Sequence, residues 1–191
     1  MAAARSAEAA LAGAPLQRAL VVGLCGFLVP GFRVGDVAVY RSIRDESAGL
    51  EIESGFFEEL RALLPSAHGV RAIQSPAIVA LPSEKSALAA RFDAQAVDME
   101  SFTLVEYLRR GGVEVGVVRI GSDASDDELP DLSPALDSSG RLSQVKLARI
   151  VASRPAAAFL LARNGLRALA ALQRAVEKLC AQDPGVEAPK A

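Results

Sequence analysis

The sequence predicts an α/β protein of three layers, in which helices cover both faces of a central mixed, mostly parallel sheet. Short apolar runs alternate along the chain with segments of helical period, which is the pattern of strands and helices that follow one another in α/β folds. Glycines and prolines separate these segments. The 191 residues, 51% of them hydrophobic, are enough for one domain with a sizeable core.

The first half of the chain follows this alternation after an alanine-rich start. We expect a short surface helix at residues 2–13, because Gly13 and Pro15 end an alanine-rich segment. Apolar or alternating runs then predict strands, and apolar residues at helical spacing before Pro65 predict a helix. The expected elements are strands at 18–25, 36–43 and 70–74, a loop at 45–54, and a helix at 56–64.

The second half contains a strand, helix, strand unit between longer helices. Ser83 is the expected N-cap of a helix at 84–92, and Gly111 and Gly112 close the helix of the central unit. An acidic, proline- and serine-rich loop that could act as a lid follows at 124–140. The remaining expected elements are strands at 94–99 and 113–120 and helices at 102–110, 141–152 and 155–179. We expect residues 1–182 to form a single domain and 183–191 to form a disordered tail.

Composition excludes several classes of function. A net charge of −2 provides no basic field for nucleic acid. The longest apolar run, residues 19–29, is too short for an integral membrane segment. Cys25 and Cys180 are too few and too distant for a disulfide scaffold, which favours a cytoplasmic location. With His68 as the single histidine, neither a Ser-His-Asp triad nor a zinc cluster is expected, and no metal is predicted.

Two acidic residues follow the two strands of the central unit. Glu100 comes after the strand at 94–99, and Asp123 comes after the strand at 113–120. Ligands bind outside the carboxyl ends of strands in α/β sheets, so we expect both carboxylates to face one crevice. Such a pair can supply an acid and an electrostatic stabiliser for sugar chemistry. Structural interpretations stay open: Asp123 could cap a turn, Glu100 could favour a helix N-terminus, and Arg119 could pair with a local carboxylate.

These residues also carry a family resemblance. The motif V-D-M-E-S at 97–101, followed by V-V-R-I-G-S-D at 117–123, resembles the signature of the nucleoside phosphorylase and nucleosidase superfamily. The segments 122–130, 137–140 and 153–155 resemble the hopanoid-associated phosphorylases in particular. The resemblance covers residues 18–179. It implies a nucleoside phosphorylase-like fold from which the family's N-terminal strands are missing.

The resemblance implies cleavage of the N-glycosidic bond of a purine nucleoside or an adenosyl compound, by hydrolysis or phosphorolysis. Asp123 would be the catalytic residue that protonates the purine at N7. Glu100 would hold the ribose hydroxyls, and Met99 would pack under the sugar. Ser122 would orient Asp123, and Arg119 and Ile78 complete the substrate-binding set. No cofactor is implied, although phosphate is a candidate co-substrate, and a homo-oligomer, most simply a dimer, is expected.

The sequence departs from the family on the side of the attacking group. Leu24 occupies the position of the hydroxyl that contacts phosphate or water, and Val21 occupies that of an arginine in hexameric phosphorylases. Neither side chain can donate a hydrogen bond to an anion, which favours hydrolysis over phosphorolysis. Three explanations are open: water held in another way, a natural chain that starts further upstream, or ligand binding without turnover. The alternative function is therefore a noncatalytic nucleoside-binding or assembly protein of the same fold.

Overall fold

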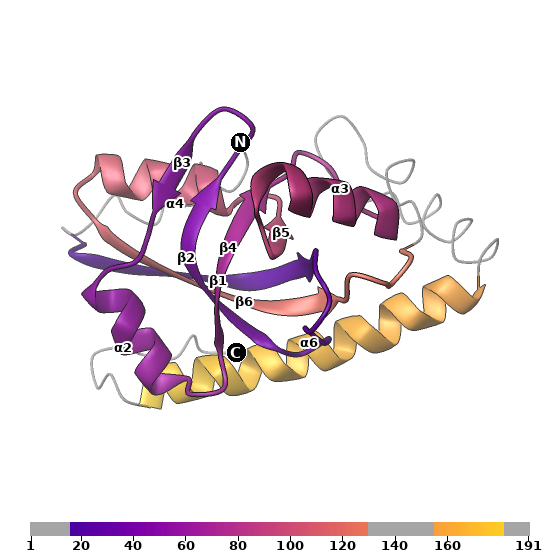
Figure 1. The fold of residues 1–191 in the computed structure, drawn as a ribbon. Helices are drawn as coiled ribbons and strands as arrows, with labels where there is room; N and C mark the ends of the chain where they lie inside the picture. Colours follow the sequence, from indigo (N-terminus) through magenta and orange to yellow (C-terminus); the bar gives the residue numbers. More distant parts are fainter. Residues whose placement is uncertain (1–15, 130–154, 182–191) are drawn as a thin grey trace, which may run out of the picture.

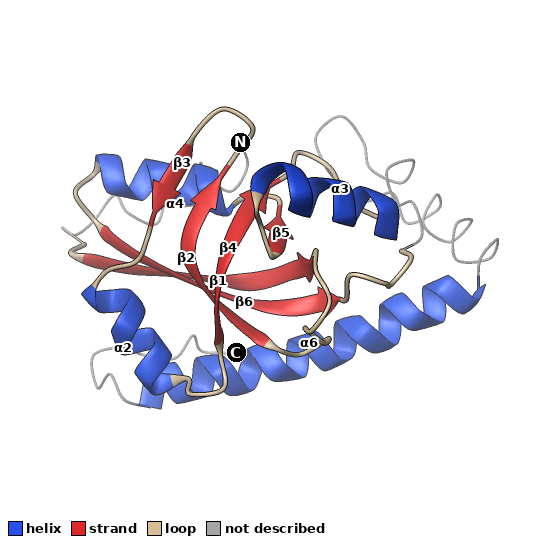
Figure 2. Cartoon of the chain, viewed as in Figure 1, coloured by secondary structure: helices blue, strands red, loops and turns tan. Residues whose placement is uncertain are grey.

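The structure, a computed structural model, describes residues 16–129 and 155–181. In this part of the chain a six-stranded sheet of mixed direction lies between helices. Helices α3 (Pro82–Phe92) and α4 (Ser101–Arg110) lie on one side, and α2 (Gly55–Leu63) and α6 (Pro155–Ala181) lie on the other (Figure 1 and Figure 2). The layered α/β architecture that the sequence predicts is therefore present.

The predicted strands and helices in the described part of the chain are confirmed, with ends that differ by a few residues. The strands are β1 (Arg18–Phe27), β2 (Val37–Arg44), β3 (Gly49–Glu51), β4 (His68–Gln74), β5 (Ala96–Asp98) and β6 (Glu114–Asp123). The expected helices at 2–13 and 141–152, the tail at 183–191, and residues 130–140 of the expected loop lie outside the described residues.

Two local expectations are wrong. The predicted loop at 45–54 contains β3, which forms an antiparallel hairpin with β2. Ser83 is not the N-cap, because α3 begins at Pro82, two residues before the expected start, and Leu81 is the N-cap residue. Pro82 lacks an N–H and suits a first helical turn. The carboxylate of Glu84 accepts hydrogen bonds from the backbone N–H groups of Leu81 (3.1 Å) and Ala80 (3.2 Å) at the start of this helix.

The strand order is β3-β2-β4-β5-β1-β6, and β2 also pairs with β6. The two longest ladders, β1–β6 and β2–β4, are parallel, whereas β5 runs antiparallel to β1. β5 meets β1 only at Gly26 and Phe27. Among the described residues, β1 therefore has β6 as its sole strand neighbour along residues 18–25.

Apolar residues of the helices attach each layer to the sheet. Phe102, Val105 and Leu108 of α4 are buried with strand residues in one cluster, and Leu88 and Phe92 of α3 pack on another. A third cluster joins α2 to α6 through Phe57, Leu60, Ala168, Ala171 and Ala175. Burial of each large apolar side chain contributes about 1.5–3 kcal/mol. None of the described helices is both long and apolar enough to cross a membrane.

Candidate functional site

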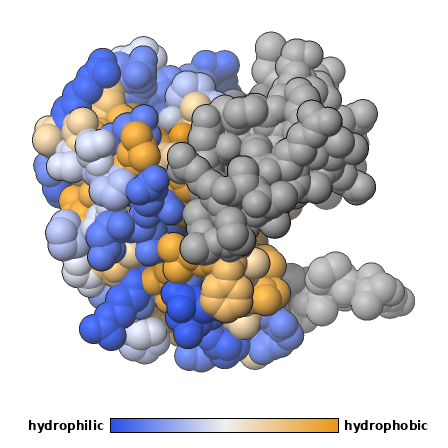
Figure 3. Space-filling model, turned by 90° about the vertical axis from the view of Figure 1, so that its right-hand side faces the viewer, coloured by the Kyte–Doolittle hydropathy of each residue, from blue (hydrophilic) through white to orange (hydrophobic). Residues whose placement is uncertain are grey.

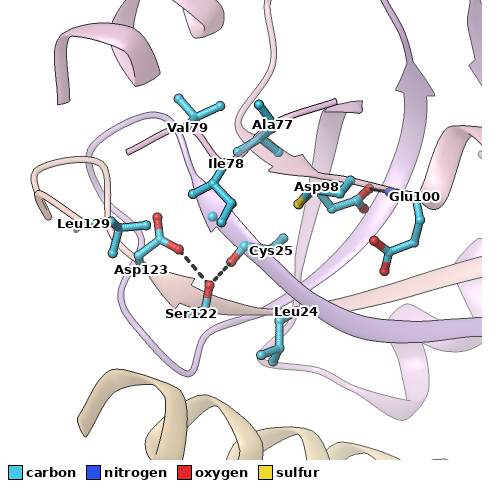
Figure 4. A pocket seen from close by; sticks show the side chains of 13 residues that line it. Leu24, Cys25, Ala77, Ile78, Val79, Asp98, Glu100, Ser122, Asp123 and Leu129 are labelled. Atoms are coloured by element: carbon cyan, nitrogen blue, oxygen red, sulfur yellow. Dashed lines mark hydrogen bonds between the residues drawn. The ribbon is translucent and has the colours of Figure 1, made fainter. Parts of the chain in front are cut away.

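A cavity of about 340 Å³ opens where β1, β5 and β6 meet. Its volume falls in the range of small-molecule sites. The end of β1, the loop after β4, the turn after β5, the end of β6 and Leu129 form its walls. The lining residues are Leu24, Cys25, Gly26, Ala77, Ile78, Val79, Val97, Asp98, Met99, Glu100, Ser122, Asp123 and Leu129. Asp123 and Glu100 lie at two ends of this cavity, with Ile78 and Cys25 between them (Figure 4).

The cavity brings Glu100 and Asp123 together, but not through the parallel carboxyl ends that the sequence analysis assumes. β6 runs parallel to β1, whereas β5 runs antiparallel to it. Both strands meet the same point of β1, because Gly26 lies opposite Val97 on one flank and opposite Asp123 on the other. The cavity therefore lies across the end of β1 and receives one carboxylate from each flank.

Asp123 is the last residue of β6 and is 5% exposed. Its Oδ1 accepts a hydrogen bond from Ser122 Oγ at 2.7 Å, and Ser122 Oγ also lies 3.1 Å from the carbonyl oxygen of Cys25. A Cβ at Gly26 would come within 2.8 Å of Asp123 Oδ2. Glycine at this position therefore leaves the space that the carboxylate occupies.

Lys85, a residue that the sequence analysis does not single out, holds the other oxygen of Asp123. Its Nζ donates to Asp123 Oδ2 at 2.7 Å, to the carbonyl oxygen of Ala124 at 2.6 Å and to that of Asp127 at 3.1 Å. Lys85 is completely buried. The sequence does contain a pattern that predicts its burial. Residues three, four and seven positions apart share one face of a helix, and at these distances Lys85 precedes the apolar residues Leu88, Ala89 and Phe92 of α3.

Glu100 is the N-cap residue of α4, and its half-exposed side chain forms an ion pair with Arg119. Arg119 Nη1 donates to Glu100 Oε1 at 3.0 Å, and Arg119 Nε lies 3.3 Å from Asp98 Oδ2. Arg119 is 2% exposed and does not line the cavity. Its position corresponds to the alternative in which it pairs with local carboxylates rather than with a ligand. Gly23 leaves room for the guanidinium, since a Cβ there would overlap Arg119 Nη1.

Asp98 is a further buried carboxylate at this end of the cavity, and the sequence analysis assigns it no role. It accepts hydrogen bonds from the Tyr40 hydroxyl at 3.0 Å and from the backbone N–H groups of Ser101 and Glu100 at 2.9 and 3.1 Å. Burial alone would lower the pKa of Arg119, but the negative charges of Asp98 and Glu100, together with the hydrogen bond to Glu100, outweigh it and raise that pKa. Arg119 therefore stays charged and fixes both carboxylates.

Two lining residues limit the chemistry available from β1. Cys25 is 3% exposed, and its burial raises the pKa of the thiol, so it is not a thiolate nucleophile at neutral pH. Leu24 also lines the cavity and offers no hydrogen-bond donor through its side chain. The carboxylates and the serine, rather than these two residues, supply the polar groups of the site.

The remaining residues of the expected site lie where a ligand could meet them. Met99 is 44% exposed although it follows a buried strand, and Ile78 lies in the loop between β4 and α3. Together with Glu100, Ser122 and Asp123, they line the cavity. His68 lies at the start of β4, 4.0 Å from Asp36, and is not a lining residue.

No protein-family model matches the sequence, and no curated protein matches it significantly. Solved structures do match. The native futalosine hydrolase of Helicobacter pylori aligns with 92% of this chain and 74% of its own length, with a TM-score of 0.61 and 16% identity. The 5′-methylthioadenosine/S-adenosylhomocysteine nucleosidase of S. pneumoniae, solved with the transition-state inhibitor MT-ImmA, aligns over 92% and 76%, with a TM-score of 0.62 and 15% identity.

A third match is the 5′-methylthioadenosine nucleosidase of Arabidopsis thaliana in its apo form, with a TM-score of 0.61 and 16% identity over 90% of this chain and 64% of that one. These matches show the fold: the chain has the α/β fold of the nucleosidases and the futalosine hydrolase that it matches. The particular proteins that it resembles are nucleosidases and a futalosine hydrolase. At these identities the likeness shows the fold alone, and substrate and reaction have to be argued from the site.

Proposed function

We propose that this protein hydrolyses the N-glycosidic bond of an adenine nucleoside or adenosyl compound. The observation that carries the proposal is the placement of Asp123 and Glu100 at two ends of one cavity of about 340 Å³. Bond cleavage leaves positive charge on the sugar and negative charge on the purine. An acid at the base and a carboxylate near the sugar oppose these two charges.

The two carboxylates have environments that suit these different tasks. Asp123 is almost buried beside Ser122, where it can protonate the purine at N7. Glu100 is partly open to the cavity and fixed by Arg119, where it can hold the ribose hydroxyls and stabilise the cationic sugar. Met99 and Ile78 supply apolar contacts for the sugar and the base.

Leu24 favours water over phosphate as the attacking group. Phosphate binding requires donors for several anionic oxygens, and a leucine side chain in the wall of the cavity supplies none. Water is neutral and needs fewer contacts. The 5′ substituent of the substrate is a finer proposal: the resemblance of residues 122–130 and 153–155 to hopanoid-associated phosphorylases supports an adenosylated lipid precursor such as adenosylhopane.

The test is an adenine-release assay on adenosine, 5′-methylthioadenosine, S-adenosylhomocysteine and adenosylhopane, each with and without phosphate. Hydrolysis releases adenine and free sugar at a rate that does not depend on phosphate. Asp123→Asn keeps the shape of the side chain but cannot donate the acidic proton, so turnover should fall by about 10²- to 10⁴-fold.

Asp126→Asn is the matched control, because Asp126 lies three residues later, is exposed and does not line the cavity. It should keep the native rate. Full activity of Asp123→Asn, or formation of a sugar phosphate only when phosphate is present, would contradict the proposal.

The presence of Leu24 in the cavity wall also favours a second candidate, a nucleoside-binding protein without turnover. In that case methylthioadenosine would raise the temperature of unfolding of the protein, and no adenine would appear even at high protein concentration. Release of adenine that depends on Asp123 would exclude this alternative.

Assembly into a dimer is part of the proposal. Phe159, Leu166 and Leu169 of α6 are large apolar side chains with exposed fractions of 70%, 70% and 53%. Figure 3 shows hydrophobic patches between hydrophilic ones on one face of the molecule. Light scattering should give twice the mass of the chain, and a monomer at all concentrations would refute the dimer.

A further inference from the structure

Lys85 is a fully buried charged residue to which the proposed cleavage gives no task. It lies in the first turn of α3, does not line the cavity, and reaches Asp123 from behind. The other buried cation described above, Arg119, contacts Asp98 and Glu100 instead. A buried lysine is costly unless its charge is compensated, so its contacts with Asp123 require an explanation.

The contacts of Lys85 fit an ammonium group. Three oxygen atoms surround Nζ, namely Asp123 Oδ2 and the carbonyl oxygens of Ala124 and Asp127. A carbonyl oxygen can only accept a hydrogen bond, and an ammonium group has three N–H donors. One proton of Lys85 is thus available for each oxygen, and a positive charge lies 2.7 Å from the Asp123 carboxyl.

The contacts of Ser122 accommodate Asp123 in its acid form. Ser122 Oγ lies within hydrogen-bond distance of Asp123 Oδ1 and of the Cys25 carbonyl oxygen, but a hydroxyl has a single proton. A proton on Asp123 Oδ1 satisfies both contacts, because Asp123 then donates to Ser122 and Ser122 donates to Cys25. Lys85 occupies the other carboxyl oxygen, Oδ2, in either state.

We propose that Lys85 is a positioning residue for the cleavage: its ammonium group stabilises the carboxylate that Asp123 becomes when its proton passes to the leaving purine. This inference rests on the proposed function. As the C–N bond breaks, its electron pair goes to the base and the proton of Asp123 goes to purine N7. Water adds to the sugar carbon and gives up a proton, which returns to Asp123. Lys85 keeps its three protons throughout and contributes its charge and its hydrogen bond to Oδ2.

The first test is a double-mutant cycle with adenine release from methylthioadenosine as the readout. Lys85→Met keeps the length of the side chain and removes its charge, and kcat should fall about ten- to a hundredfold, the range expected for loss of a hydrogen bond between charged groups. KM should stay near its native value, because Lys85 is outside the cavity wall. In the Asp123→Asn background the same substitution should cost almost nothing, because the group on which Lys85 acts is gone.

The second test uses a leaving group that needs no acid. p-Nitrophenyl β-D-riboside releases a stable phenolate, so Lys85→Met should slow its hydrolysis far less than it slows the release of adenine. A merely structural lysine would affect both substrates equally. Lys85→Gln, which keeps two N–H donors without the charge, should resemble Lys85→Met in kcat and serves if the methionine variant does not fold.

Lys178→Met on the exposed face of α6 is the control and should keep native rates. Losses that multiply in the double variant, or equal losses on both substrates, would overturn the role of Lys85 while leaving the proposed function intact. A native protein that releases no adenine would instead overturn the proposed function, and this inference with it.

Discussion

The two ends of the cavity hold their carboxylates in different ways. At the Glu100 end, Arg119 bridges Glu100 and Asp98. Asp98 accepts four further hydrogen bonds, from the hydroxyls of Tyr40 and Ser101 and from the backbone N–H groups of Glu100 and Ser101. At the Asp123 end, Lys85 donates one hydrogen bond to the carboxylate and two more to carbonyl oxygens of the loop that follows Asp123.

The difference suits the task that the proposed reaction gives to each end. A guanidinium with a raised pKa keeps its charge, so the Glu100 end is a fixed array that suits static stabilisation of a cationic sugar. The Asp123 end contains Ser122 and Lys85, whose hydrogen bonds accommodate both forms of a carboxyl group. In the proposed reaction, the Glu100 end holds charge and the Asp123 end exchanges a proton.

The largest expected effect concerns the stability of the Glu100 end. Arg119→Met leaves Asp98 buried without its cation and should lower the free energy of unfolding by about 3–5 kcal/mol, measured by urea denaturation. Arg110→Met breaks an exposed pair with Glu106 on α4 and should cost about 0–1 kcal/mol. Equal losses in the two variants would mean that the buried array does not stabilise the fold.

One glycine lies beside the charged groups of each end: Gly23 beside Arg119 and Gly26 beside Asp123. Gly23→Ala places a Cβ against the fixed guanidinium of Arg119 and should lower the free energy of unfolding by about 1–3 kcal/mol. Gly26→Ala should mainly displace the Asp123 carboxylate and slow adenine release by about a hundredfold, with a smaller loss of stability. Urea denaturation and the adenine-release assay on both variants measure this contrast. Equal losses of stability and equal losses of rate in the two variants would contradict the difference between the ends.

The smallest expected effect concerns the attacking group. Leu24→Ser adds a hydroxyl to the cavity wall between the two ends and should raise the phosphate-dependent rate about fivefold, the value of one ordinary hydrogen bond. Separate assays of free sugar and sugar phosphate measure it. No response to phosphate would mean that more than one missing contact excludes that anion.

The sequence predicts elements better than their arrangement. Local patterns, namely apolar runs, apolar period and the residues that end helices, predict nine of the strands and helices in the described part of the chain. The antiparallel direction of β5 and the pairing of β2 with β6 are not encoded in any local pattern. The three-residue β3 is too short to show a period.

The same distinction applies to the site. Glu100 and Asp123 are recognisable because they lie at the ends of buried strands in a motif that resembles a known family. Lys85 donates a hydrogen bond to a residue 38 positions away, and only the fold brings the two together. Arg119 is part of the motif, but whether it meets a ligand or Asp98 depends on burial, which the sequence does not specify.

The one-sided pairing of β1 has a consequence for how the protein behaves at high concentration. A strand that pairs on one side directs about half of its amide and carbonyl groups to the other, and among the described residues no strand meets them along residues 18–25. A strand of another protein, or of a second copy of this one, can pair with such an edge and start aggregation. A charged side chain introduced at the unpaired edge within residues 18–23 should suppress such association without changing the cavity wall.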